Sequence, residues 1–76
     1  MSRRRLLVRL SNSYEAVLKL LLFAKQGRIS LRELHLKSDD DEISAEMVVE
    51  APPEKVDWFV KKASGSPIVI ECRSLE

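Results

Sequence analysis

A strand–helix–strand pattern in the first half of the chain most constrains the fold. Apolar residues recur at every second position over Leu6–Leu10, which is the period of a strand with one buried face. A polar loop, Ser11-Asn12-Ser13, precedes a predicted helix over Tyr14–Gln26, and a second strand is predicted over Ile29–Leu36 after a glycine stop. A chain that begins in this way lays its helix across the sheet that contains both strands.

The predicted helix contains more apolar residues than one buried stripe requires. Spacings of three and four residues indicate the stripe that faces the sheet: Tyr14, Val17, Leu18, Leu21 and Ala24. Three further apolar residues lie at its flanks or beyond it: Leu20, Leu22 and Phe23. In a chain of 76 residues, this surplus predicts contact with another subunit.

The two ends of this helix carry ordinary helix signals. Ser13 is placed to accept a hydrogen bond from a free amide of the first turn, and Glu15 suits the positive end of the helix dipole. Lys25 suits the opposite end, and Gly27 is expected to take the left-handed conformation that closes a helix.

The second strand has an irregular pattern. Ile29 and Leu31 share one parity, whereas Leu34 and Leu36 share the other. A regular strand cannot send all four to one face, so either a bulge lies near Arg32-Glu33 or both faces of the strand meet apolar partners.

The second half of the chain repeats strand, helix and strand. The acidic segment from Ser38 to Glu42 is predicted to be a solvated hairpin turn rather than a calcium loop, because it lacks the glycine and spaced ligands of an EF-hand. A helix is predicted from Pro53 to Ala63. The flanking strands are expected to turn these residues inward: Ile43, Ala45, Met47 and Val49, then Ile68, Ile70 and Cys72.

The predicted order is therefore βαββαβ. It indicates an α+β, ferredoxin-like sandwich: a four-stranded antiparallel sheet in the order 4-1-3-2, with two helices on one face. Residues 1–76 form one predicted domain, with residues 1–4 as a basic arm and residues 75–76 as a cloning scar. The surplus apolar helix and the irregular second strand are neighbours in this layout. We therefore expect a homodimer formed by pairing second strands.

Composition excludes several classes of function. The net charge of +1 gives no general attraction to nucleic acid or membranes, and no leader or membrane-spanning segment is expected. One cysteine and one histidine make neither an internal disulfide nor a zinc site, which favours a reducing, cytoplasmic setting without a metal or cofactor.

The remaining chemistry-bearing residues do not form a catalytic set. Cys72 has the parity of a buried, inert thiol, and the open sheet face has no aromatic residues on which RNA bases would stack. On that face Arg9 is expected to pair with Glu46 or Glu71. His35 is either an exposed edge residue or part of a ligand site. Trp58 lies off its helix stripe, and either anchors a partner or packs on the helix surface. No enzyme activity is expected.

The polar loop before the first helix is the best candidate binding site. The small polar groups of Ser11, Asn12 and Ser13 lie where free amides favour a carboxylate. They are expected to hold the ends of an amino acid, while Ile29 and Leu31 of a neighbouring chain hold its side chain. The alternative is simple helix capping with nothing bound.

These residues resemble the ACT domain, and are most similar to the short type of the small regulatory subunit of acetolactate synthase. The resemblance rests on Asn12 in the first loop, on Ala24-Lys25-Gln26-Gly27, on the second-strand pattern and on Val49-Glu50-Ala51-Pro52-Pro53. The first loop lacks the Asp-x-x-Gly-like turn of many effector-binding ACT domains.

The resemblance implies a non-catalytic regulatory subunit of branched-chain amino acid biosynthesis. It implies a large thiamine-diphosphate-dependent catalytic subunit as partner, and a branched-chain amino acid held at a dimer interface. The effector-binding residues implied are those named above. The interface residues expected are Leu20, Leu22, Phe23, Leu34 and His35. The alternative is a stand-alone or engineered ferredoxin-like dimeric interaction module with no effector.

Overall fold

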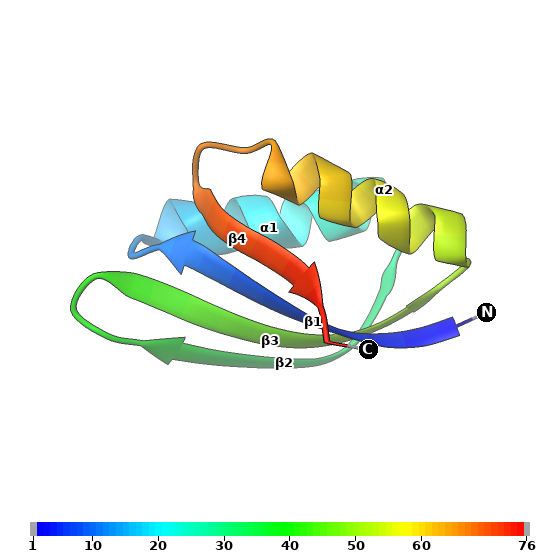
Figure 1. Cartoon of the computed structure of the whole chain (residues 1–76), viewed down its shortest axis with the longest axis horizontal. Helices are drawn as coiled ribbons and strands as arrows, with labels where there is room; N and C mark the ends of the chain where they lie inside the picture. The colour runs from blue at the N-terminus through cyan, green and yellow to red at the C-terminus, as the bar shows by residue number, and fades with distance from the viewer. Residues whose placement is uncertain (1, 76) are drawn as a thin grey trace.

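The computed structural model describes residues 2–75 and has the predicted order of elements (Figure 1). The elements are β1 (Ser2–Ser11), α1 (Tyr14–Gln26), β2 (Ser30–Ser38), β3 (Glu42–Ala51), α2 (Pro53–Ser64) and β4 (Val69–Ser74). The strands form one antiparallel sheet in the order β2-β3-β1-β4, and both helices lie on the same face of it. The predicted ferredoxin-like fold is confirmed.

The two central strands supply the floor of the core. In the β1–β3 ladder, Leu6 lies opposite Met47 and Val8 lies opposite Ala45, and all four side chains are fully buried. The largest buried side chain is Phe59 of α2, which lies in the same core cluster. These inward positions agree with the alternation in the sequence.

The predicted basic arm is wrong for the residues that the structure describes. β1 starts at Ser2, because β3 continues to Ala51 and offers backbone partners along the whole length of β1. At the other end of the chain, the Leu75 amide donates a hydrogen bond to the Arg5 carbonyl at 2.9 Å. Met1 and Glu76 lie outside the described residues, so the cloning-scar prediction stays a prediction.

The buried stripe predicted for α1 is confirmed at Ala24 but is otherwise wrong by about 100° around the helix, which is one residue step. The residues that face the core are Ala16, Leu20 and Ala24, whereas Leu18 is 65% exposed and Tyr14 is 89% exposed. Of the surplus assigned to Leu20, Leu22 and Phe23, Leu22 is confirmed as exposed. The assignment is wrong for Leu20, which is fully buried, and for Phe23, which packs half-buried against the core.

The alanines explain this orientation. Ala16, Leu20 and Ala24 are spaced four residues apart, so they form one row along the helix. Two small residues on either side of one leucine let the helix backbone approach the sheet closely while the leucine fills the space between. Leucine at every contact position would hold the helix further from the sheet.

The helix ends at Gly27, but the expected left-handed glycine is wrong. Gly27 has φ −81°, and the left-handed residue is Arg28 with φ 55°. Glycine is required here for space: a Cβ on Gly27 would lie 2.6 Å from Cζ3 of Trp58. Trp58 of α2 therefore packs against the end of α1, with 40% of its surface still exposed.

Both edge strands contain a bulge. In β2 the register shifts between Leu31 and Glu33, which confirms the predicted bulge near Arg32. In β4 the register shifts so that Val69 lies opposite Leu10 while Glu71 lies opposite Arg9. Ile70 is the extra residue and is 52% exposed, so the prediction that it points inward is wrong.

Candidate functional site

The loop from Ser11 to Ser13 is fixed at both ends. The Ser11 amide donates to the Ile68 carbonyl at 2.9 Å, and the Ala16 amide donates to Oγ of Ser13 at 3.2 Å. Ser13 has an extended backbone, φ −152° and ψ 153°, as a helix N-cap requires. The predicted cap is confirmed, so the Ser13 hydroxyl oxygen is already bonded to the first turn of α1.

Asn12 is held by the hairpin turn between β2 and β3. Its Nδ2 donates to the Asp39 carbonyl at 3.3 Å, and its Oδ1 accepts from Oγ of Ser38 at 3.2 Å. Asp39 orders this hairpin turn, because its carboxylate accepts hydrogen bonds from the Asp41 and Glu42 amides, each at 2.9 Å. These bonds confirm the predicted solvated turn and lower the pKa of Asp39.

A hollow of about 360 Å³ opens beside this loop; we call it the loop hollow. Its lining residues are Asn12, Ser13, Tyr14, Ser38 and Ile43. An amide and two hydroxyls lie beside an aromatic ring and an aliphatic side chain, which is a lining suited to a small molecule with one polar and one apolar part. Tyr14, Ser38 and Ile43 were not in the predicted site. The sequence signal that pointed to Ser38 was its place at the start of the predicted acidic turn.

The second half of the effector site was predicted to come from a neighbouring chain, so Ile29 and Leu31 need not lie near the loop of their own chain. Ile29 and Leu31 follow α1, whereas the loop precedes it, and a helix of 13 residues separates them by about 20 Å. Ile29 is 7% exposed and belongs to its own chain's core, so the expectation that it contacts an effector across an interface is corrected. Leu31 is 38% exposed and remains available to a second chain.

The predicted interface residues occupy different environments. Leu20 is fully buried in its own chain, which removes it from any subunit contact. Phe23 faces α2, where the Lys62 ammonium lies 5.7 Å from the centre of its ring. Leu34 is half-buried against the core, whereas Leu22 and His35 are exposed.

The bulge in β2 places its leucines on one side. Leu31 lies opposite Val49, Leu34 opposite Met47, and Leu36 opposite Ala45, and these partners are all buried beneath the helices. The three leucines therefore face the helix side of the sheet. Leu36 is nevertheless 47% exposed, because α1 does not cover the outer part of β2.

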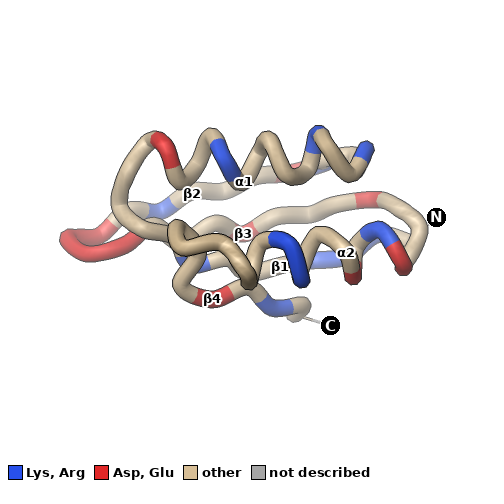
Figure 2. The backbone as a smooth tube through the Cα atoms, turned by 90° about the horizontal axis from the view of Figure 1, so that it is seen from above, with Lys and Arg blue, Asp and Glu red and all other residues tan. Residues whose placement is uncertain are grey.

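The neighbouring flank of α1 adds to this apolar surface. Phe23 marks the flank that faces α2, and α1 runs alongside β2 (Figure 2), so we infer from the helix period that the opposite flank lies on the β2 side. This flank carries Tyr14, Leu18 and Leu21, with Val17 half-buried against the core at its base. Together with Leu31, Leu34 and Leu36 they form what we call the edge surface.

β2 is also a better edge for pairing than β4. It has nine residues, and the described part of the chain places no strand on its outer side. β4 has six residues and is interrupted by the Ile70 bulge. A longer edge with apolar residues beside it is the one that favours addition of another strand.

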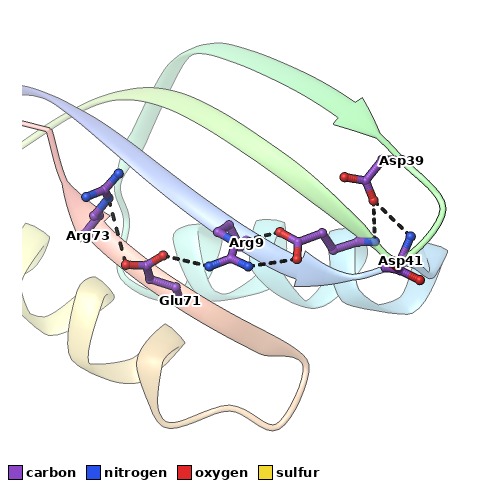
Figure 3. Close-up of polar contacts among 6 residues, drawn as sticks. Arg9, Asp39, Asp41, Glu71 and Arg73 are labelled. Carbon is purple, nitrogen blue, oxygen red and sulfur yellow. Dashed lines mark hydrogen bonds and ion pairs between the residues drawn. The ribbon is translucent and has the colours of Figure 1, made fainter.

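The open face of the sheet is a network of ion pairs rather than a reactive site (Figure 3). Arg9 donates to Glu42 at 2.6 and 2.9 Å and to Glu71 at 3.1 Å, while Arg5 donates to Glu46 at 2.6 Å. Of the two partners predicted for Arg9, Glu71 is confirmed and Glu46 is wrong. The bonds from Arg9 lower the pKa of Glu42, and the bond from Arg32 lowers the pKa of Glu50.

A second, wider hollow of about 740 Å³ lies on this open face next to the β2 edge. It is lined by Arg3, Arg5, Glu33, His35, Glu46 and Val48. Its charged groups largely pair with one another: His35 lies 3.3 Å from Glu33, and Arg5 is bonded to Glu46. Neither hollow contains a nucleophile with an adjacent base.

Among residues 2–75, Cys72 and the side chains of metal-binding type form neither a reactive site nor a metal site. Cys72 is a free thiol, half-buried on the core side, and desolvation raises its pKa to about 11. Such a thiol is a poor nucleophile at neutral pH, as expected. Among residues 2–75, no three His, Cys, Asp or Glu side chains are grouped to hold a metal ion. No helix in that range is long and apolar enough to cross a membrane.

Comparison with known proteins identifies the fold. No model of a protein family matches the sequence, and no curated protein matches it. The crystal structure of the ACT domain from GTP pyrophosphokinase of Chlorobium tepidum matches with a TM-score of 0.82 and 9% identity, over 96% of each chain.

Two other solved structures show the same arrangement. The C-terminal domain of the MgtC protein from Mycobacterium tuberculosis matches with a TM-score of 0.70 and 18% identity, over 95% of this chain and 83% of that one. Homoserine dehydrogenase from Thiobacillus denitrificans matches with a TM-score of 0.75 and 12% identity, over 96% of this chain and 17% of that one. The chain therefore has the ferredoxin-like fold of ACT domains.

Proposed function

We propose that this chain is a non-catalytic, ACT-like regulatory domain that works as a homodimer through the edge surface. The observation that carries the proposal is the position of Leu31, Leu34 and Leu36, which face the helix side of an edge strand with no strand of residues 2–75 beyond it. Tyr14 and Leu18 extend the apolar area onto α1. Pairing two β2 strands covers this area and satisfies the exposed backbone groups of both edges.

The regulatory part of the proposal concerns the loop hollow. A second chain placed along β2 brings new side chains near the outer part of each subunit, and the loop hollow opens beside the end of β2 at Ser38. Its amide and hydroxyl groups suit the charged ends of a small amino acid, and Tyr14 and Ile43 suit an aliphatic side chain. Asn12 is the residue that we assign to recognition of the effector.

The identity of the effector and of the catalytic partner rests only on the resemblance of this sequence to a known ACT-domain subunit. That resemblance points to the small subunit of acetolactate synthase in branched-chain amino acid biosynthesis, with a large thiamine-diphosphate-dependent subunit as partner. We accordingly propose valine, leucine or isoleucine as the effector and the cytoplasm as the compartment.

Isothermal titration calorimetry with valine, leucine and isoleucine tests the regulatory proposal. Binding heat with one of them that disappears in the Asn12→Ala variant supports it. Lys19→Ala, on the exposed surface of α1, is the matched control and should bind as the unaltered chain does. Heat that survives in Asn12→Ala would place the effector elsewhere.

One observation favours a second candidate, a stand-alone or engineered dimeric interaction module with no effector. Both polar groups of the Asn12 side chain are already bonded, to Ser38 and to the Asp39 carbonyl. An effector that uses Asn12 must replace those bonds. A stable dimer that gives no heat with any of the three amino acids supports this second candidate.

A further inference from the structure

The pattern of β2 limits how a second copy is able to pair with it. Beyond the bulge, Leu34 and Leu36 face the helix side, and Glu33, His35 and Lys37 face the open side. In an antiparallel pair, residues directly opposite each other lie on the same face of the sheet. A symmetric pair of β2 strands must therefore be centred on a residue, because centring it between two residues sets apolar side chains against charged ones.

The apolar residues select among the allowed centres. Leu34 is the middle residue of the nine in Ser30–Ser38, so a pair centred on it uses the whole strand. That register sets Leu34 against its own copy. Because the bulge at Arg32 shifts the pairing by one residue, it also brings Leu36 toward Leu31 of the other chain rather than opposite Arg32. A pair centred on His35, counted across the same bulge, sets Leu34 against Leu36 of the other chain. It leaves Ser30 beyond the paired segment and places Leu31 at the end of that segment beside Ser38, without an apolar partner.

We infer that a second copy of this chain pairs with β2 in the register centred on Leu34, so that Glu33 of each chain lies directly opposite His35 of the other. This inference rests on the proposed function, in which β2 is the dimer edge. It adds a specific contact on the open face of the sheet, on the side away from the helices and from the loop hollow.

The charges around His35 fit this register. Within one chain, Nε2 of His35 lies 3.3 Å from Oε1 of Glu33, and His35 lies opposite Glu46 of β3, which Arg5 of β1 already neutralises. Lys37 lies on the same face of β2 as His35. Arg3 of β1 lines, with His35, the wider hollow on the open face. In the dimer each imidazole gains the second chain's Glu33, so each ring lies near two carboxylates.

Cysteine cross-linking tests the register directly. Opposite residues in an antiparallel pair have Cα atoms about 4.5–5.5 Å apart, within disulfide range, whereas residues two places away are about 7–8 Å apart. In a Cys72→Ala background, oxidation of a mixture of Glu33→Cys and His35→Cys chains should give a disulfide between the two variants. Each variant oxidised alone should give about tenfold less.

Other results would overturn the inference in distinguishable ways. Strong cross-linking of His35→Cys with itself would centre the pair on His35. A dimer by sedimentation without either disulfide would place β2 outside the contact or in another register. A chain that is monomeric at tens of micromolar would remove the proposed function itself, and not this register alone.

Discussion

Gly27 and Trp58 fix the junction between the two helices. The indole ring lies over the backbone of Gly27 so closely that a Cβ there would approach Cζ3 of Trp58 to 2.6 Å and Cδ1 of Ile29 to 3.3 Å. Trp58 is thus at least partly a packing residue, the second of the two roles considered for it from the sequence. The contact also explains why the chain has a glycine at a position with an ordinary helical φ.

Gly27→Ala should therefore lower the free energy of unfolding by about 1–3 kcal/mol, because the ring must move or the helix end must shift. Chemical denaturation followed by tryptophan fluorescence measures this. Gly65→Ala is the matched control: it also follows a helix, its φ is −84°, and its nearest contact is 3.5 Å from the Lys61 carbonyl. That change should be neutral or stabilising by about 0.5 kcal/mol. Equal losses in both variants would contradict the packing role of Trp58.

Leu18 and Leu20 should separate association from folding. Leu20 is fully buried, so Leu20→Ala should cost about 2–5 kcal/mol of stability. Leu18 is 65% exposed on the edge surface, so Leu18→Glu should change monomer stability by no more than about 0.5 kcal/mol while weakening association at least tenfold. Denaturation and sedimentation of both variants measure the two effects. Loss of stability in Leu18→Glu without loss of association would remove α1 from the interface.

Acid should destabilise the fold through the open-face ion pairs. Arg9 lowers the pKa of Glu42, and Arg32 lowers the pKa of Glu50, so both carboxylates hold fewer protons in the folded chain than in the unfolded chain. Their stabilisation is complete above the unfolded values near pH 4.5 and is lost as the pH falls through the lower folded values. Thermal melts from pH 6 to pH 2 should show this decline, and Arg9→Met should make it smaller. An identical acid profile in Arg9→Met would contradict the assigned cause.

Cys72 should react slowly in the folded chain. Its pKa of about 11 leaves a much smaller thiolate fraction at pH 8 than an ordinary thiol has. Alkylation by iodoacetamide at pH 8 should therefore be about a hundredfold slower in the native chain than in 6 M guanidinium chloride. Mass spectrometry over time measures both rates. A native rate close to the denatured one would show that the β4 edge opens readily.

Sequence periodicity was sufficient for the elements and the topology, because the strands alternate, β2 on either side of its parity break, and each helix has its own stop. Periodicity was not sufficient to predict which side of α1 faces the sheet. With apolar residues at almost every position from Val17 to Ala24, several stripes fit the same helix, and the alanines that permit close approach to the sheet give a weak signal. The surplus was real, but it lies on Tyr14, Leu18 and Leu22 rather than on Leu20 and Phe23.

Of the two bulges, one could be predicted from the sequence and the other could not. The parity break in β2 was visible in the sequence, because leucines stand on both sides of it. The bulge at Ile70 was not, because Ile68, Ile70 and Cys72 continue a regular alternation and only the pairing with β1 breaks it. For the candidate site, the loop was visible as a helix cap. Its bonds to Ser38 and Asp39 depend on a hairpin that lies 26 and 27 residues further along the chain.

Sedimentation velocity of the unaltered chain at tens of micromolar is the decisive measurement for the proposed dimer. We expect a dimer that becomes a folded monomer when Leu18→Glu or Leu36→Lys is introduced, since both residues belong to the edge surface. A well-folded monomer in the unaltered chain, or a dimer that neither substitution weakens, would contradict it.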